Sequence, residues 1–321
     1  MVAGTASYTT QLGPSGPTVS SLGIGTWAWG DSLFWSYGKD YSDDQLQAAF
    51  HTAIDSGITL FDTAEVYGLG ESERLIGRFL KQTQQPVAIA TKYFPLPWRF
   101  TADAISSALK ASLDRLQVDK VALYQVHWPF DLFLGQDGLM NALADEVMQG
   151  RIETIGVSNY SADQMKKAHE ALAKRGIPLA VNQVQYSLLA RKIESNGVLE
   201  ASRELDVTIL AYSPLAQGLL TGKYSLESGE RPTGARSIDP RFSRRGLEKL
   251  APVLDALQAI AHAHARTPAQ VALNWLIAQG NVIPIPGAKN ARQAEQNAGA
   301  LGWSLTLEEC DRLSAVTANW S

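Results

Sequence analysis

Eight short apolar segments alternate with longer segments of helical period along the chain, and this alternation restricts the possible folds more than any other feature. Several of the short segments carry aliphatic or β-branched residues at consecutive positions, which is typical of parallel strands covered on both faces. The expected strands cover residues 21–27, 58–63, 87–92, 121–127, 154–158, 180–186, 207–212 and 282–287.

The segments between these strands begin with helix start signals. Ser42, Thr101, Ser161 and Thr267 are N-cap residue types, and a proline follows the last of them at the first helical position. Eight strands that are each followed by a helix predict an α/β fold, a (β/α)8 TIM barrel, with residues 1–321 as a single domain. A turn signal inside residues 1–20 predicts a short N-terminal β-hairpin. A doubly wound sheet would more often show a glycine fingerprint after its first strand, and none is present.

Composition argues against several classes of function. The formal net charge is -4 and the isoelectric point is about 5.8, whereas a nucleic-acid partner favours a basic surface. No stretch reaches ~18 uninterrupted apolar residues, so we expect no membrane span. The start of the chain lacks a secretory signal and the single cysteine, Cys310, fits a reducing compartment, so we expect a cytoplasmic protein. The oligomeric state stays open, with a monomer slightly favoured.

One connection is too long for an ordinary strand-to-helix loop. Residues 224–246 are polar, contain glycine and proline, and include five arginines. Long loops of this kind are usually functional lids or disordered segments. This loop could fold over an anionic cofactor or be a solvated surface loop, and the sequence favours neither.

Four titratable side chains stand at the ends of three neighbouring expected strands, where a barrel of this kind keeps its active site. Asp62 ends the second strand, Tyr67 lies in the loop after it, Lys92 ends the third strand and His127 ends the fourth. Each alone has an ordinary explanation as a cap or a hydrogen-bonded core residue. A lysine at the end of an apolar strand needs a partner, however, and Asp62 is the natural candidate. The four together predict a catalytic site.

This set of groups suits protonation of a carbonyl oxygen. A free tyrosine, with a pKa of about 10, donates poorly at neutral pH. A lysine cation about 4 Å away would favour the Tyr67 phenolate by roughly 4 kcal/mol at an effective dielectric of about 20. Burial opposes this effect, so we expect a smaller net fall in the pKa of Tyr67. Asp62 would keep Lys92 charged, and a neutral His127 would orient the carbonyl. The set supplies a proton but no electrons, so an electron donor is required.

Five motifs resemble those of the aldo-keto reductase superfamily, in the family's order and spacing. They are GITLFDTAEVYGLGESERLIG at 57–77, TKYF at 91–94, QVHWP at 125–129, GVSNYS at 156–161 and IPIPGAKNARQAEQN at 283–297. The resemblance covers nearly the whole chain. It implies a (β/α)8 barrel that binds NADP(H) in extended form without a Rossmann motif. It also implies an enzyme that reduces aldehydes or ketones to alcohols.

The resemblance implies roles for individual residues. Tyr67 would be the general acid, Lys92 and Asp62 its tuning pair, and His127 the substrate-orienting group. The implied cofactor-binding residues are Gly25, Thr26, Trp27, Asp62, Ser158, Asn159, Gln183, Tyr212, Ser213, Pro214, Leu215, Gln217, Gly218, Lys223, Gly287, Lys289, Gln293, Gln296 and Asn297.

Parts of this set correspond to parts of the cofactor. By the same resemblance, Ser158 and Asn159 would hold the nicotinamide carboxamide, with Gln183 beside them. Tyr212 would stack under the nicotinamide ring, because an aromatic plane fixes a flat group by offset stacking. The segment 213–218 would wrap the pyrophosphate, and Lys223 could pair with it.

The adenosine end departs from the best-known branch of the superfamily. That branch has an arginine at the position of Gln293 and a glutamate at that of Gln296. The chain is more similar to the branch that includes potassium-channel β subunits and related bacterial and plant oxidoreductases. Since an arginine grips phosphate at two points, its absence weakens the expected hold on the 2′-phosphate. Lys289 and Arg292 could replace part of that charge, and NADPH remains favoured over NADH.

Aromatic residues gather in the loops that would surround the barrel mouth. Aromatic linings favour apolar or aromatic carbonyl compounds, although some of these rings could simply pack the barrel rim. Reactive aldehydes, pyridoxal-like compounds, dicarbonyls and plant-like secondary metabolites all remain open as substrates. The expected substrate-binding residues are Trp27, Tyr67, Trp98, His127 and Trp128, with Trp29, Trp35 and Phe94 nearby.

Two other functions remain as alternatives. An NADP(H)-binding regulatory or sensing subunit with little turnover is compatible with relatives in the same branch. A metal-dependent barrel hydrolase or lyase is disfavoured, because the five histidines are scattered along the chain. His262 and His264 lie two apart on an expected helix and so point to different faces. We therefore expect no metal site.

Overall fold

The eight expected strand segments form one sheet of eight parallel strands, in which neighbours follow the order of the chain. The computed structural model describes residues 8–130, 134–232 and 234–320. The first and last strands meet where the Gly25 N–H donates to the Pro286 carbonyl at 3.0 Å, which nearly closes the sheet into a barrel. The strands are β3 (Gly23–Gly25), β4 (Leu60–Asp62), β5 (Ala88–Tyr93), β6 (Val121–Val126), β7 (Ile152–Ser158), β8 (Leu179–Gln185), β9 (Thr208–Tyr212) and β10 (Val282–Pro284).

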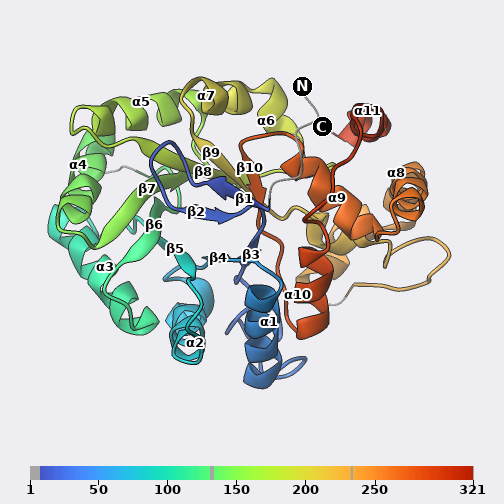
Figure 1. The fold of residues 1–321 in the computed structure, drawn as a ribbon, viewed down its shortest axis with the longest axis horizontal. Helices are drawn as coiled ribbons and strands as arrows, with labels where there is room; N and C mark the ends of the chain where they lie inside the picture. The colour runs from blue at the N-terminus through green and yellow to red at the C-terminus, as the bar shows by residue number, and fades with distance from the viewer. Residues whose placement is uncertain (1–7, 131–133, 233, 321) are drawn as a thin grey trace.

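Helices surround the barrel, and at least one follows each strand (Figure 1). Because α1 packs against α10, the helical ring closes at the same seam as the sheet. The predicted (β/α)8 barrel is therefore confirmed. Within the described ranges, no helix combines the length and the apolar character needed to cross a bilayer. The helices are α1 (Asp43–Asp55), α2 (Glu71–Leu80), α3 (Ala102–Leu116), α4 (Gly135–Met148), α5 (Ala162–Ala173), α6 (Lys192–Ser195), α7 (Val198–Glu204), α8 (Arg244–Ala263), α9 (Pro268–Ile277), α10 (Ala291–Ala298) and α11 (Leu307–Val316).

The predicted helix starts are confirmed. Ser42, Thr101, Ser161 and Thr267 are the N-cap residues of α1, α3, α5 and α9, each in an extended conformation. Ser161 and Thr267 also form capping boxes, in which the cap and the third helical residue satisfy each other's backbone N–H. A cap of this kind is worth about 0.5–2 kcal/mol. It fixes where the helix begins and therefore how long the preceding loop is.

An antiparallel hairpin of β1 (Thr9–Gln11) and β2 (Thr18–Ser20) crosses the N-terminal end of the barrel (blue in Figure 1). In its turn, the Gly13 N–H donates to Thr208 Oγ1 at 3.0 Å, at the start of β9. The predicted hairpin is confirmed in its described part, and residues 1–7 of the predicted segment lie outside the described residues. The hairpin covers this end of the barrel and leaves the other end to the strand-to-helix loops.

Residues two apart along the strands point into the barrel and build its interior in layers. Leu60, Ala90, Leu123, Val181 and Leu210 belong to the buried apolar cluster inside it. A polar layer follows two positions later on the same five strands, toward the C-terminal end of the barrel. Its members are Asp62, Lys92, Gln125, Gln183 and Tyr212.

The long loop predicted at 224–246 ends earlier than expected. The helix α8 begins at Arg244, capped by the Ser243 side chain, so the last three residues of the predicted loop are helical. Before α8 the chain makes two 3-10 turns, η3 (Gly234–Ile238) and η4 (Pro240–Phe242). Residue 233 lies outside the described residues.

Candidate active site

The four titratable side chains predicted at the strand ends lie together at the C-terminal end of the barrel. Lys92 Nζ is 2.6 Å from Asp62 Oδ2 and 3.3 Å from Tyr67 Oη. His127 directly follows β6, and its ring stands edge-on to the Tyr67 ring with 5.8 Å between centroids. The expected ion pair between Asp62 and Lys92 is therefore present, and the other two groups adjoin it.

The Lys92 ammonium has three N–H groups and three acceptors. It is fully buried, and it donates to Asp62 Oδ2 at 2.6 Å, to the Thr63 carbonyl at 2.8 Å and to Tyr67 Oη at 3.3 Å. An ammonium can only donate hydrogen bonds, so the phenol oxygen is the acceptor in the third contact. The phenol proton of Tyr67 therefore points away from Lys92 and can be given to another group.

The second carboxylate oxygen of Asp62 is held by two side-chain amides. Gln183 Nε2 donates to Asp62 Oδ1 at 2.7 Å and Gln125 Nε2 donates to it at 3.1 Å. A buried ion pair needs such additional hydrogen bonds to offset its desolvation. Gln183 was expected near the cofactor, whereas Gln125 was not predicted at all. The signal that identifies it is its place on β6, two residues before His127 and in the same inward-facing register.

The pKa of Tyr67 is raised above its ordinary value, which corrects the expected fall. Burial of the phenol is the largest cause, the Lys92 cation lowers the pKa, and the Asp62 carboxylate raises it. Because Asp62 offsets part of the effect of Lys92, burial prevails. The pKa of Lys92 is raised as well, since Asp62 and Tyr67 together outweigh the lowering by burial. Tyr67 thus keeps its proton at neutral pH, as a proton donor must.

His127 is neutral in this site. Burial, reinforced by the nearby Lys92 cation, lowers the pKa of His127 to about 3. Its Nδ1 is buried and has no hydrogen-bond partner among the described residues. A neutral imidazole keeps one N–H donor, so His127 can donate a hydrogen bond to a substrate oxygen but cannot serve as a cationic acid.

Ser158, Asn159 and Tyr212 form a hydrogen-bonded group at the ends of β7 and β9. Tyr212 Oη donates to Asn159 Oδ1 at 3.1 Å, and Asn159 Nδ2 donates to Ser158 Oγ at 3.1 Å. Asn159 has a φ of 62°, a left-handed conformation in which asparagine is enriched. The Tyr212 ring is partly exposed, so it can contact a planar ligand. The structure thus brings together the residues expected at the nicotinamide, and the fourth of them, Gln183, accepts from Ser158 Oγ and from the Asn159 N–H through its carbonyl.

The turn after Tyr212 is built from left-handed residues. Ser213, Ala216, Gln217 and Gly218 have φ values of 51°, 48°, 58° and 101°. For a residue other than glycine this conformation costs roughly 1–2 kcal/mol, and such strain concentrates at ligand sites. The turn contains Ser213 and Gln217, both partly exposed, whose hydroxyl and amide are groups able to donate to phosphate oxygens. Pro214 and Leu215 complete it, the first buried and the second partly exposed.

Lys223, expected near the pyrophosphate, has a different neighbour in the structure. Its Nζ lies 3.3 Å from Glu230 Oε2, and both side chains are more than half exposed. A surface ion pair of this kind is weak, so it leaves Lys223 able to exchange partners.

Two cations share the indole of Trp35 at the expected adenosine end. Lys289 Nζ lies 4.5 Å and Arg236 Cζ 5.5 Å from the ring centroid. Arg236 Nη1 also donates to the Gln217 carbonyl at 3.4 Å. Burial and the Arg236 charge lower the pKa of Lys289 to about 8. The loop 224–246 therefore reaches the loop before α1, and it brings there Arg236, one of the five arginines of the loop that could fold over an anionic cofactor.

The other residues expected at the adenosine end surround the start of α10. Gln293 Oε1 accepts from the Lys289 backbone N–H at 2.8 Å, and Asn297 Nδ2 donates to the Gly287 carbonyl at 3.2 Å. The Gln296 carbonyl accepts from the Gln270 side chain of α9 at 3.0 Å. The first two bonds hold the turn that carries Lys289, and the third joins α10 to α9.

The end of β3 supports the site from the neighbouring strand. Thr26 Oγ1 donates to the Asp62 carbonyl at 2.9 Å, and Gly25 pairs with Gly287 across the barrel seam. Trp29, by contrast, is fully buried and donates through Nε1 to the Ala288 carbonyl at 2.8 Å. The expectation that Trp29 lies near the mouth is wrong, because its ring packs into the core between the sheet and the helices.

Three tryptophans expected to bind substrate are accessible. The exposed fractions are 68% for Trp98, 40% for Trp27 and 39% for Trp128. Trp27 stacks on Phe34 with 5.0 Å between centroids, and Trp128 stacks on Phe130 with 6.1 Å. These rings lie on loops that follow β3, β5 and β6, so they offer apolar contact area on the same side of the barrel as Tyr67.

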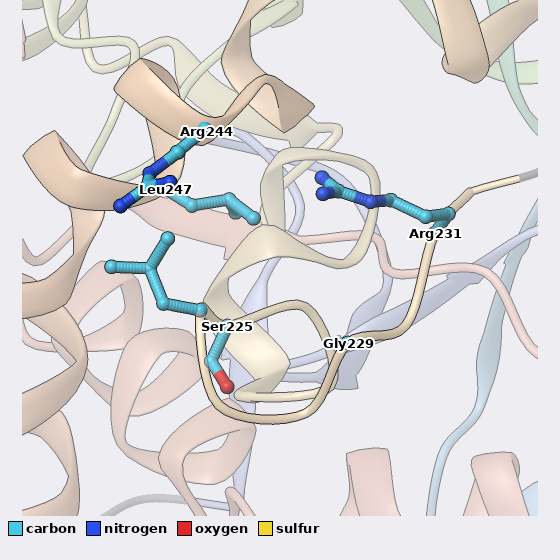
Figure 2. A pocket seen from close by; sticks show the side chains of 6 residues that line it. Ser225, Gly229, Arg231, Arg244 and Leu247 are labelled. Atoms are coloured by element: carbon cyan, nitrogen blue, oxygen red, sulfur yellow. The ribbon is translucent and has the colours of Figure 1, made fainter.

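A separate pocket of about 340 Å³ lies where the loop 224–246 meets α8 (Figure 2). The two arginines that line it already have partners. Arg231 donates to the Phe242 carbonyl at 3.2 Å and Arg244 pairs with Glu248 at 3.0 Å. We assign this pocket no chemistry. The pocket is lined by Ser225, Leu226, Gly229, Arg231, Arg244 and Leu247.

Across the described residues no group of His, Cys, Asp and Glu side chains could hold a metal ion.

The chain is similar to known proteins over nearly its whole length. The model of the Aldo/keto reductase family matches residues 21–318. The chain is 44% identical over 311 residues to a chloroplastic pyridoxal reductase of Arabidopsis thaliana, covering 93% of this chain and 83% of the relative. It is 33% identical over 326 residues to an NADP(+) aldo-keto reductase of Schizosaccharomyces pombe, covering 94% and 92%.

Solved structures are similar over nearly the full length. A glycerol dehydrogenase from Gluconobacter oxydans superposes with a TM-score of 0.83 at 31% identity, covering 97% of this chain and 95% of that one. An aldo-keto reductase from Klebsiella pneumoniae in complex with NADPH superposes with a TM-score of 0.74 at 28% identity, covering 96% and 95%.

Proposed function

The chain belongs to the aldo/keto reductase family, and from this premise we propose that it reduces aldehydes and ketones to alcohols with NADPH, using Tyr67 as the proton donor. The observation that carries the proposal is the hydrogen bonding of Lys92. All three of its N–H groups have acceptors, and one acceptor is the Tyr67 oxygen. The phenol proton of Tyr67 therefore points away from Lys92, and the Lys92 cation can stabilise the phenolate that remains after proton transfer.

The residues around this point fit an extended dinucleotide. Ser158 and Asn159 supply polar groups beside a partly exposed Tyr212 ring. At the expected adenosine end, Lys289 and Arg236 supply positive charge suited to phosphate. When bound there, NADPH supplies the hydride for the carbonyl carbon. The relatives named for NADP(+) and solved with NADPH support this choice of cofactor.

The chain itself orients the carbonyl and moves the proton. His127, held neutral, donates a hydrogen bond to the carbonyl oxygen and directs it toward Tyr67. Tyr67 then gives its proton to that oxygen, and the Lys92 cation at 3.3 Å stabilises the phenolate. Asp62, fixed by two amides, keeps Lys92 charged and in place. A positioned acid of this kind typically contributes about 10²- to 10⁴-fold to the rate.

We further propose that aromatic aldehydes are the preferred substrates. The accessible rings of Trp27, Trp98 and Trp128 offer the apolar surface that such compounds need. The similarity to a pyridoxal reductase makes pyridoxal the first compound to test.

We also propose how the whole protein is organised. Residues 1–321 act as a single barrel domain, and the loop 224–246 covers the bound cofactor. The protein works in the cytoplasm as a monomer. Size-exclusion chromatography tests the monomer.

The test of the function is a fluorescence titration with NADPH and NADH, followed by steady-state NADPH oxidation with a panel of aldehydes and ketones. We expect saturable binding of NADPH and turnover with at least one aromatic aldehyde. Tight NADPH binding without turnover on any carbonyl would instead favour a sensing or regulatory subunit. Failure to bind either nucleotide would overturn the proposal.

The pH dependence of turnover follows from the two shifted pKa values. Tyr67 must be protonated to donate, and its raised pKa keeps it so up to and beyond about pH 10. His127, with a pKa of about 3, stays neutral over the whole working range. We expect kcat/KM for the aldehyde to stay flat from about pH 6 to 9 and to fall only in more alkaline solution. A fall in kcat/KM below about pH 6.5 would mean that a histidine with an ordinary pKa controls the reaction.

Replacement of Lys289 by methionine should weaken NADPH binding about 10-fold or more, because a charge-assisted hydrogen bond to phosphate is worth about 1.5–3 kcal/mol. NADH, which lacks the 2′-phosphate, should lose less than about 3-fold. Fluorescence titration measures both affinities. Lys174→Met, an exposed lysine paired with Asp137 at 3.9 Å, is the matched control. Equal losses for both nucleotides would remove Lys289 from the 2′-phosphate.

A further inference from the structure

Two loops at the barrel mouth are joined by a bidentate ion pair between Glu65 and Arg99. Arg99 Nη1 lies 2.5 Å from Glu65 Oε1, and Arg99 Nη2 lies 2.9 Å from Glu65 Oε2. The Glu65 side chain is only 8% exposed and that of Arg99 22%. Two parallel N–H···O bonds fix direction as well as distance, which a single contact cannot do. We call this pair the rim latch.

Each partner of the rim latch is also bound to the backbone of the loop after β5. The Phe94 N–H donates to Glu65 Oε1 at 2.7 Å, and Arg99 Nη1 donates to the Phe94 carbonyl at 3.1 Å. The guanidinium lies over the Tyr93 ring, 5.3 Å from its centroid. Residues 94–99 are thereby tied at both ends to one carboxylate.

The rim latch adjoins the proposed proton donor on one loop and a proposed substrate contact on the other. Glu65 is two residues before Tyr67, and Arg99 directly follows the exposed Trp98. The Phe94 ring stands edge-on to His127, with 5.4 Å between centroids. The pair therefore holds the wall that carries Phe94 and Trp98 against the loop that carries Tyr67.

The chain contains a second buried glutamate–arginine ion pair at the opposite end of the barrel, in which two arginine nitrogens reach one carboxylate oxygen. Arg151 Nη2 lies 2.5 Å from Glu146 Oε2, with a buried glutamate and a partly exposed arginine. Arg151 directly precedes β7 and so lies at the N-terminal end of the strands. If such pairs only stabilise the fold, removal of either arginine should have the same effect on catalysis.

We propose that Glu65 and Arg99 are positioning residues that hold the loop 94–101 as one wall of the substrate site and set the KM for bulky aromatic aldehydes. The inference rests on the proposed reductase function. Neither residue transfers a proton or contacts the cofactor in this reading. They act through Trp98 and Phe94, so the reaction of a small aliphatic aldehyde does not depend on them.

The experiment compares Arg99→Met and Glu65→Gln with the control Arg151→Met. NADPH-dependent reduction is measured with a bulky planar aldehyde, pyridoxal, and with a small one, propanal. For both rim-latch variants we expect the KM for pyridoxal to rise about 10-fold or more. The kcat, the KM for propanal and the Kd for NADPH should change less than about 3-fold. Arg99→Lys should recover the pyridoxal KM only in part, because an ammonium cannot bind a carboxylate as a planar fork.

A measurement that needs no activity completes the test. Amide hydrogen exchange of residues 94–101 should be about 10-fold faster or more in Arg99→Met and unchanged in Arg151→Met. Equal losses on both aldehydes, or the same kinetic change in Arg151→Met, would overturn the proposal, as would unaltered exchange in the loop. A wild-type protein that reduces no carbonyl contradicts the proposed function instead, and the exchange result then decides whether the rim latch holds its loop.

Discussion

Replacement of Tyr67 by phenylalanine should lower kcat for aldehyde reduction about 100-fold or more while NADPH still binds. The variant removes one oxygen, which accepts a hydrogen bond from Lys92 at 3.3 Å and which we propose carries the proton to be transferred. Lys92 keeps its two shorter bonds, to Asp62 and to the Thr63 carbonyl, so the ion pair survives. The loss should therefore appear in kcat and not in the free energy of unfolding. Steady-state kinetics measure the loss of kcat, fluorescence titration measures the retained NADPH binding, and urea denaturation measures the unchanged free energy of unfolding.

Tyr124→Phe is the matched control for this experiment. Tyr124 is fully buried on β6, and its hydroxyl has no hydrogen-bond partner among the described residues. The same atom is deleted, but away from Lys92 and His127, so kcat should stay within about 2-fold. Removal of an unpaired buried hydroxyl should not destabilise the protein. If Tyr67→Phe retained the turnover of this control, another group would have to be the acid.

The sequence predicted the barrel well because its signals are local. Runs of apolar residues mark the strands, and cap residues such as Ser161 and Thr267 mark where helices begin. The strand ends then follow from the same pattern, and so does the meeting of Asp62, Lys92 and His127 at one end of the barrel. Side chains alternate between the inside and the outside of the barrel along β6, so the pattern also indicated that Gln125 points inward. The prediction missed Gln125 because an amide alone suggests no chemistry.

The predictions that were wrong or missing concern how deeply a side chain is buried and which residues distant in the sequence it contacts. The sign of the Tyr67 pKa shift depends on how burial compares with two opposite charges, and burial is a property of the folded structure. Trp29 was expected near the barrel mouth, but its side chain is fully buried in the core, and the sequence does not show in which direction the side chain points. The contact of Arg236 with Trp35 joins residues about two hundred positions apart, through a loop without periodicity. No local pattern encodes such a contact.

Replacement of Lys92 by methionine should remove nearly all turnover and also destabilise the protein. The substitution keeps most of the side-chain volume but leaves the Asp62 carboxylate buried without its cation. Asp62 Oδ1 retains the amides of Gln125 and Gln183, whereas Oδ2 loses its partner at 2.6 Å. Breaking a buried ion pair on one side costs about 3–5 kcal/mol. Urea denaturation measures this loss as a lower free energy of unfolding.

The double variant Asp62→Asn with Lys92→Met separates the two consequences. It removes both charges, so no uncompensated ion remains in the barrel, and most of the lost stability should return. Turnover should not return, because the phenolate of Tyr67 would form without a cation beside it. If the stable double variant recovered turnover to within about 10-fold of the wild type, the Lys92 charge would be structural and would not assist the acid. If the double variant stayed as unstable as Lys92→Met, the cost would lie in packing and in the lost bond to the Thr63 carbonyl.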